Sequence, residues 1–222
     1  VIASAFSGDT PAHLERQATV HILSARVGRW RGIFAHHSWI VVKERNAQSY
    51  TRFDVVGWGQ PVRINHRDAD GRWYGNAPQI IAELKGADAE RLIPRIRSAV
   101  QSYAYSQPGT YHAWPGPNSN SFVQHVLASV PELHQALPPT AIGKDFRGNG
   151  FFVGLTPSRT GVQSPLYGLA ALTIGWIEGI EVNVLGLVAG IDVRHPAIKL
   201  PGWGRIGCCA PAIAEQSPGT TT

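Results

Sequence analysis

Residues 114–130 read WPGPNSNSFVQHVLASV, and this stretch predicts how the rest of the chain is arranged. Its two prolines and the glycine between them cannot continue a helix, whereas apolar residues recur every three or four positions from Phe122 to Val130. Asn118 is a favourable N-cap, because its side-chain oxygen accepts hydrogen bonds from N–H groups two or three residues later. We therefore expect a helix that starts beside Asn118 and carries Ser119 in its first turn.

Ser119 is a candidate nucleophile because of this position. The first turn of a helix has N–H groups without intrahelical partners and lies at the positive end of the helix dipole, so it stabilises developing negative charge. Serine is also common near helix starts for capping alone. Both interpretations remain open from the residues themselves.

The composition is that of a globular protein. The chain has 222 residues, of which 43% are hydrophobic and 16% charged, enough for one domain with a sizeable core or a domain with an appendage. The net charge of +5 favours anionic neighbours such as phospholipid headgroups or cell-wall polymers. Since no Lys/Arg-rich run occurs, we expect no nucleic-acid partner.

The two ends of the chain carry weaker signals. Ala3-Ser4-Ala5 has the small-x-small form of a signal-peptidase site, so residues 1–17 are interpreted as a leader or irregular segment; an arbitrary sequence boundary explains them equally well. Cys208 and Cys209 are adjacent, and neighbours in sequence rarely bridge each other. We expect residues 208–222 to be a disordered tail.

The pattern before the 114–130 stretch predicts an α+β core over residues 18–150. Period-two alternation predicts strands over 19–26, 33–43 and 50–58, joined as an antiparallel meander. A short helix is expected over 77–84, and apolar spacing predicts a longer one over 88–103.

Residues 151–207 are expected to form a glycine-rich β extension packed on this core. The apolar run 166–191 is long enough to span a bilayer, but Glu178, Glu181 and Asn183 in its middle make a spanning helix costly. Alternating apolar residues favour buried strands, with a membrane-touching hairpin or helix as the alternative. Whether the three polar residues face outward or line an interior stays open.

Several segments resemble a bacterial family of unknown function that is found mainly in proteobacteria. The resemblance spans about residues 18–207 and is carried by WRGIFAHHSWIVVK, RWYGNAP, WPGPNSNSF, LPPTAIGKDF and the glycine-rich stretch from residue 168. This family resemblance implies no activity.

A more distant likeness does imply chemistry. A strand histidine followed much later by Asn-Ser-x-x-Phe at a helix start is similar to the permuted branch of the papain-like NlpC-type superfamily, which includes lecithin–retinol acyltransferase-like proteins. The resemblance implies a permuted papain-like core in which His37 is the base and Ser119 occupies the nucleophile position. Relatives carry cysteine there, and serine has a far higher pKa and depends more on its base. Asp54, on the next expected strand, is the candidate orienting group, although a structural ion pair explains it as well.

Further residues are candidates for substrate binding because they flank the proposed catalytic groups. These are Asn118, Asn120, Trp114, His36 and Tyr50. His37 on an apolar strand face and Trp114 in a Pro-rich turn also have purely structural explanations. Lys144 and Asp145 are expected to pair with each other or to hold an anionic group.

The sequence thus leads to two hypotheses of different classes. In the first, the protein is an envelope-associated hydrolase or acyltransferase that acts on an amide, ester or thioester bond of a lipid-linked or peptide substrate. In the second, it is a catalytically inactive envelope module that binds or holds a ligand in the same cleft. We expect no metal and no cofactor, since the histidines lack ligand spacing, and place the protein on the periplasmic side of the envelope, with contact to the membrane surface.

Overall fold

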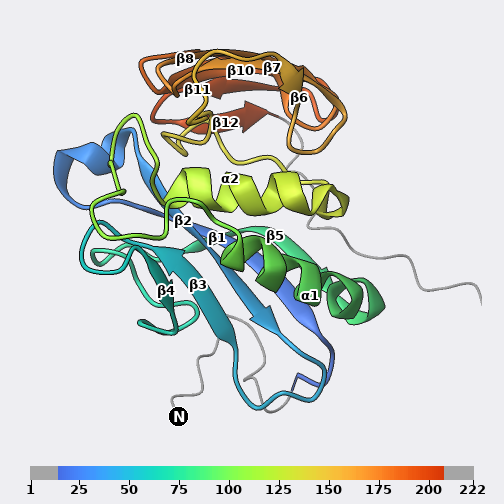
Figure 1. Ribbon diagram of the computed structural model, residues 1–222. Helices are drawn as coiled ribbons and strands as arrows, with labels where there is room; N and C mark the ends of the chain where they lie inside the picture. The colour runs from blue at the N-terminus through green and yellow to red at the C-terminus, as the bar shows by residue number, and fades with distance from the viewer. Residues whose placement is uncertain (1–14, 208–222) are drawn as a thin grey trace, which may run out of the picture.

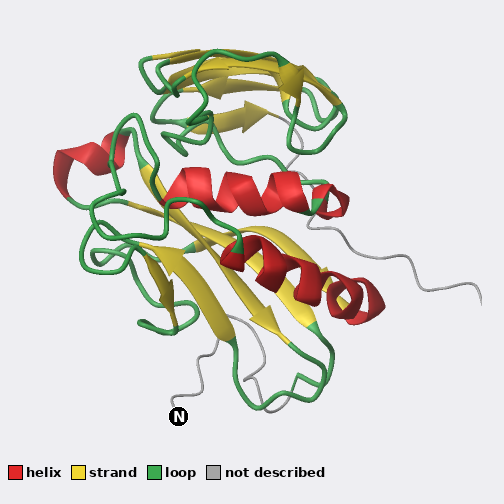
Figure 2. Cartoon of the chain, in the orientation of Figure 1, coloured by secondary structure: helices red, strands yellow, loops and turns green. Residues whose placement is uncertain are grey.

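The computed structural model describes residues 15–207, which form two antiparallel sheets, two α-helices and short 3-10 turns. The expectations for residues 1–14 and 208–222, including both cysteines, lie outside the described residues. In Figures 1 and 2 the two sheets lie on opposite sides of the second helix, α2. The polypeptide is therefore mixed α+β, as predicted.

The first sheet has five strands in the order β4-β3-β2-β1-β5. Strands β1 to β3 form the expected meander, β4 continues it as a strand that was not predicted, and β5 adds to the free edge of β1 in antiparallel register. Their bounds are β1 Thr19–Arg26, β2 His36–Lys43, β3 Thr51–Val55, β4 Val62–Ile64 and β5 Gln79–Lys85.

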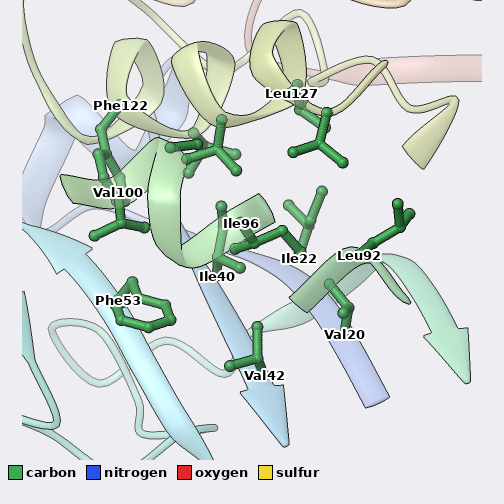
Figure 3. Packing of buried hydrophobic residues seen from close by; sticks show 14 of the residues in the cluster. Val20, Ile22, Ile40, Val42, Phe53, Leu92, Ile96, Val100, Phe122 and Leu127 are labelled. Carbon is green, nitrogen blue, oxygen red and sulfur yellow. The ribbon is translucent and has the colours of Figure 1, made fainter. Parts of the chain in front are cut away.

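Both helices pack on one face of this sheet and form the main core with it. Helix α1 spans Gly86–Gln101 and α2 spans Ser119–Ser129, so both predicted helices are confirmed. Alternate strand residues such as Ile22 and Ile40 meet Ile96 of α1 and Phe122 of α2 (Figure 3). The apolar residues that recur with helical spacing in α1 and α2 therefore pack against those that alternate along the strands, and together they form one apolar layer.

Three predictions from the first half are corrected by the structure. Residues 77–84 are not a helix but mostly strand β5, whose backbone groups bond to the edge of β1. The strand expected from Ile33 begins at His36, because a 3-10 turn occupies Arg29–Ile33. A Cβ at Gly32 would lie 2.3 Å from the Val27 carbonyl oxygen, and this close approach requires glycine in that turn. The third strand ends at Val55, earlier than predicted.

The second sheet is a seven-stranded meander in the order β12-β11-β10-β9-β8-β7-β6. The predicted strands are confirmed, but buried and exposed residues alternate along β8 and β9, so these strands bury only one of their two faces. Within residues 15–207, no helix has the length and apolarity needed to cross a membrane. The strands are β6 Gly154–Leu155, β7 Gly161–Leu166, β8 Ala170–Gly175, β9 Gly179–Val184, β10 Leu187–Asp192, β11 Ala197–Leu200 and β12 Gly204–Gly207.

Polar side chains fill the buried face of this second sheet. The Glu181 carboxylate contacts Lys144 and lies 2.6 Å from the Lys199 ammonium, and all three side chains are buried. Asp145 accepts from Gln163 and Asn183, each at 2.7 Å. Lys144 thus pairs more closely with Glu181 than with Asp145, which lies 3.8 Å away.

Glu178, Glu181 and Asn183, the polar residues of the apolar run 166–191, are therefore buried on the inner face of the second sheet. Lys144 and Asp145 lie on the segment between α2 and the second sheet, so their bonds to the strands fasten the two parts of the chain together. A second connection comes from Trp114, whose Nε1 donates to the Leu185 carbonyl at 2.9 Å.

We predict that Glu181→Gln lowers the free energy of unfolding at pH 7 by about 3 kcal/mol, because two buried lysines lose their carboxylate. Burial favours the neutral acid, but Lys144 and Lys199 outweigh it and lower the pKa of Glu181. The stabilisation is present above the ordinary pKa of glutamate and is lost as the pH falls through the lowered, folded-state value. The difference between wild type and variant should therefore shrink on acidification, as measured by urea unfolding.

Glu44→Gln is the matched control, since Glu44 forms an ion pair with Arg97 in which both side chains are substantially exposed. This control should cost less than about 1 kcal/mol. Equal losses for the two variants would contradict a stabilising role for the buried cluster.

Candidate functional site

The N-terminus of α2 is fixed by a reciprocal cap. The Asn118 side-chain oxygen accepts from the N–H groups of Asn120 and Ser121, at 2.9 and 3.1 Å. Ser121 Oγ in turn accepts from the Asn118 N–H at 2.7 Å, which completes a capping box. The Asn118 amide donates to the carbonyls of Ala113 and Ile142. The cap thus ties the helix start to the chain on both sides of it.

Ser119 is the first residue of this helix, and it is buried. Its Oγ and its backbone N–H have no hydrogen-bond partner within residues 15–207, whereas the next two N–H groups are occupied by the cap. Ser119 therefore combines an uncommitted hydroxyl with one uncommitted N–H group at the positive end of a helix.

A side-chain hydrogen bond places the start of α2 against the start of β2. Asn120 Nδ2 donates to the His36 carbonyl at 2.9 Å and to the Ile142 carbonyl at 2.8 Å. The bond thus joins the residue that follows Ser119 to the residue that precedes His37. Two segments that are 84 positions apart in sequence meet here.

On β2 and β3, His37 belongs to a buried polar chain. His37 Nε2 lies 2.7 Å from Asp54 Oδ1, and the other oxygen of Asp54 accepts from Arg52 Nη2 at 2.6 Å and from Nε at 3.1 Å. Asp54 and Arg52 have no exposed surface, and His37 is 3% exposed. Two charge-assisted hydrogen bonds from one guanidinium to the same oxygen fix the carboxylate, which then fixes the imidazole ring.

The charge state of Asp54 decides which nitrogen of His37 carries the proton. Burial favours the neutral carboxyl, but the charges and hydrogen bonds of His37 and Arg52 outweigh it and lower the pKa of Asp54. An ionised carboxylate only accepts, so Nε2 must be the donor, and in the neutral ring Nδ1 keeps its lone pair. His37 Nδ1 has no partner within residues 15–207. The His37 side chain lies on the face of β2 that Trp39 and Trp73 share, whereas Ile40 on the opposite face packs against α2.

Aromatic rings enclose this chain. The ring of Trp73 stacks on the His37 ring with a centroid distance of 3.7 Å and an interplanar angle of 3°. The Arg52 guanidinium lies 4.0 Å from the centroid of the Trp39 ring. These contacts limit rotation of the imidazole and keep the ion pair away from water.

A comparison with protein-family models assigns the chain. Residues 17–146 match the model of a protein of unknown function, DUF3750. The chain belongs to the DUF3750 family. The matched region contains the first sheet and both helices, and hence His37, Asp54 and Ser119. No curated protein and no solved structure matches the chain.

In this DUF3750 protein, His36 lies near the site but points to the other face of β2. Its Nδ1 lies 3.1 Å from the Thr140 hydroxyl, and its Nε2 is buried without a partner. Burial, together with the charge of Arg26, lowers the pKa of His36 to about 4, so the ring is neutral at pH 7. His36 also lines a cavity of about 820 Å³ between the two sheets, which neither His37 nor Ser119 lines.

Two other residues predicted to bind substrate have different surroundings. Tyr50 precedes Thr51, and Thr51 pairs with Val42, which is five residues along β2 from His37. The centroid of the Tyr50 ring lies 6.3 Å from that of the His21 ring. Trp114 contacts the turn between β9 and β10. The structure therefore does not bring Tyr50 to the His37 ring, and it uses Trp114 to connect the sheets.

Arg52, Trp73 and Tyr111 were not predicted as site residues. Arg52 is two positions before Asp54, so strand alternation identifies the two as neighbours on one face. Trp73 reaches His37 from a loop, and no sequence pattern signals that contact. Burial, followed by the charge of Asp54, raises the pKa of Tyr111 to about 12, so its hydroxyl stays protonated near this site. Within residues 15–207, no group of three or more His, Cys, Asp or Glu residues is arranged to hold a metal.

We predict that Gly143→Ala disrupts the cap of α2. A Cβ at Gly143 would lie 2.3 Å from Asn118 Nδ2, and the positive φ of +88° adds backbone strain. Gly75 is a matched control, because its φ is +84° but nothing lies within 4 Å of the added Cβ. Gly75→Ala should cost about 1 kcal/mol of unfolding free energy, and Gly143→Ala about 2 kcal/mol more. Equal costs in urea unfolding would show that the contact with Asn118 is unimportant.

Proposed function

We propose that this protein is an envelope-associated hydrolase or acyltransferase that acts on an amide, ester or thioester bond of a lipid-linked or peptide substrate. Ser119 is the nucleophile, His37 the general base and Asp54 the group that orients His37. Two observations carry the proposal: the buried His37–Asp54 hydrogen bond of 2.7 Å leaves Nδ1 without a partner within residues 15–207, and the Asn120 bond joins the start of α2 to the backbone of the residue before His37.

The proposed reaction starts with attack of Ser119 Oγ on the acyl carbon while its proton moves to His37 Nδ1. The Ser119 N–H stabilises the oxyanion of the tetrahedral intermediate. Collapse of that intermediate breaks the bond to the leaving amine, alcohol or thiol, which takes the proton from His37 and leaves an acyl ester on Ser119. Water in a hydrolase, or a second nucleophile in a transferase, then attacks the ester and returns the proton through His37 to Ser119.

The order of the elements supports a permuted papain-like core. The strand with the base comes first, the adjacent strand with the carboxylate follows, and the helix with the nucleophile comes last. The net charge of +5 suits substrates held at anionic surfaces, which favours an envelope location.

A catalytically inactive binding module of the envelope is the second candidate. Three observations favour it: the His37 side chain lies on the face of β2 opposite to α2, Trp73 covers one face of the His37 ring, and the cap occupies the N–H groups of the two residues after Ser119. Among residues 15–207, the Ser119 N–H is then the one backbone donor left free in the first turn of α2, and serine is a weaker nucleophile than cysteine at neutral pH.

Labelling with a serine-reactive fluorophosphonate, followed by peptide mass spectrometry, separates the two candidates. We predict that the wild-type protein is labelled at Ser119 and that Asp54→Asn slows labelling about 10³-fold, because His37 loses the carboxylate that fixes its tautomer. Ser119→Ala should not be labelled, and Ser119→Cys should react with a thiol reagent at a rate that depends on His37.

Ser129→Ala is the matched control, since Ser129 lies at the exposed end of the same helix. It should label at the wild-type rate. If the folded wild-type protein is not labelled, or Ser119→Ala is labelled equally, the catalytic proposal fails and the binding module is favoured. Circular dichroism of each variant shows whether it is folded.

A further inference from the structure

The outer face of the second sheet is apolar from one edge to the other. A single cross-strand row passes through all seven strands, and neighbouring members of the row are paired in the sheet register. Its members are 39–62% exposed. The row consists of Leu155, Val162, Ile174, Ile180, Ile191, Ile198 and Ile206. Strand spacings of about 4.8 Å make it about 29 Å long.

A second and a third row extend this face, and among their side chains only Ser164 can form a hydrogen bond. Leu172 pairs with Val182 in the second row, and Val184 pairs with Leu187 in the third. Isolated exposed apolar residues are ordinary, but a continuous apolar face of this extent marks an interaction surface.

The buried charges show why this face points outward. Inward positions alternate with the exposed rows and carry Gln163, Thr173, Glu181, Asn183 and Lys199, which form hydrogen bonds among themselves and with Lys144 and Asp145. If the strands presented their other face to the interior, the apolar rows would face Lys144 and Asp145. The charges of Glu181 and Lys199 would then lose their buried partners. The orientation of the sheet is thus fixed by its polar side.

The exposed charges at the edge of this face are all positive. Arg159 and Arg194 are exposed, and they lie in turns at the same end of the meander, with the exposed Trp176 in the turn between them. The acidic residues of the sheet are committed elsewhere: Glu178 and Glu181 are buried, and Asp192 bonds to Arg205.

We propose that this face binds the surface of a bilayer that contains anionic phospholipids. The aliphatic rows enter the boundary of the acyl chains, Trp176 lies at headgroup level, and Arg159 and Arg194 contact lipid phosphates. Aliphatic burial and attraction to anionic lipids are the two sources of affinity at such an interface, and tryptophan is enriched there. The proposal does not depend on the chemistry of Ser119.

A second copy of the chain fits this face less well. Face-to-face self-association would bring identical patches together, and the exposed arginines would then find no exposed acid on the partner's sheet. Typical protein interfaces also carry about ten hydrogen bonds, whereas the paired rows offer one hydroxyl, that of Ser164. An anionic lipid surface supplies the missing negative charge without requiring directional bonds.

The test is flotation of the full chain with vesicles of phosphatidylcholine alone or mixed with phosphatidylglycerol. We expect the wild type to float with the mixed vesicles. The double variant Ile174→Glu/Ile191→Glu should have a vesicle partition coefficient at least about tenfold lower than that of the wild type. The double variant Arg159→Gln/Arg194→Gln should have a partition coefficient about tenfold lower on the anionic vesicles only. Ser119→Ala should float like the wild type, whether or not Ser119 is catalytic.

Ile64→Glu is the matched control, since Ile64 is a 59% exposed isoleucine on β4 of the other sheet. It should float like the wild type, and melting curves verify that every variant is folded. A wild type that does not float, or a double variant that floats equally well, overturns the proposal. A dimer in light scattering that the double variant abolishes, without vesicle binding, overturns it in favour of a second copy.

Discussion

The buried carboxylate of Asp54 is the group on which the arrangement of the candidate site depends. A carboxylate without exposed surface is costly unless it is paired, and here Arg52 and His37 supply the opposing donors. Because Arg52 takes one oxygen through two bonds, the other oxygen faces His37 alone. The same interaction therefore keeps Asp54 ionised, orients the imidazole and selects its tautomer.

The cap of α2 imposes a complementary constraint from the other side. Asn118 spends all its side-chain hydrogen bonds on the helix start and on two neighbouring carbonyls, and Asn120 bonds to the chain beside His37. These amides hold Ser119 in place, which explains why polar residues around it are buried. Their role is one of positioning, and it serves a catalytic site or a binding site equally.

Much of the fold follows from local sequence patterns. The Asn118 cap, the apolar spacing of both helices and the alternation of β1 indicate their elements directly. Residues 79–85 form β5 and not the predicted helix, because pairing with the edge of β1 is a long-range interaction that overrides weak local preference. Alternation also predicted the strands after residue 160, but the charged partners of Glu181 decide which face is inside.

The site was predictable only in part for the same reason. His37, Asp54 and Ser119 lie in local patterns that mark strand and helix positions, and Arg52 shares a strand face with Asp54. Trp73 comes from a loop, and its stacking on His37 depends on how that loop closes over the sheet. The separation of Tyr50 from His37 follows from the register of β2 with β3, which strand patterns alone do not define.

The most direct measurement is the protonation of the two ring nitrogens of His37 by long-range proton–nitrogen NMR, in wild type and Ser119→Ala. A base oriented by Asp54 requires a proton on Nε2, a bare Nδ1 at neutral pH, and a change in the Nδ1 shift when the Ser119 hydroxyl is removed. A neutral ring protonated on Nδ1 would contradict the proposed pairing of base and nucleophile. An Nδ1 chemical shift that is the same in wild type and Ser119→Ala would contradict it as well.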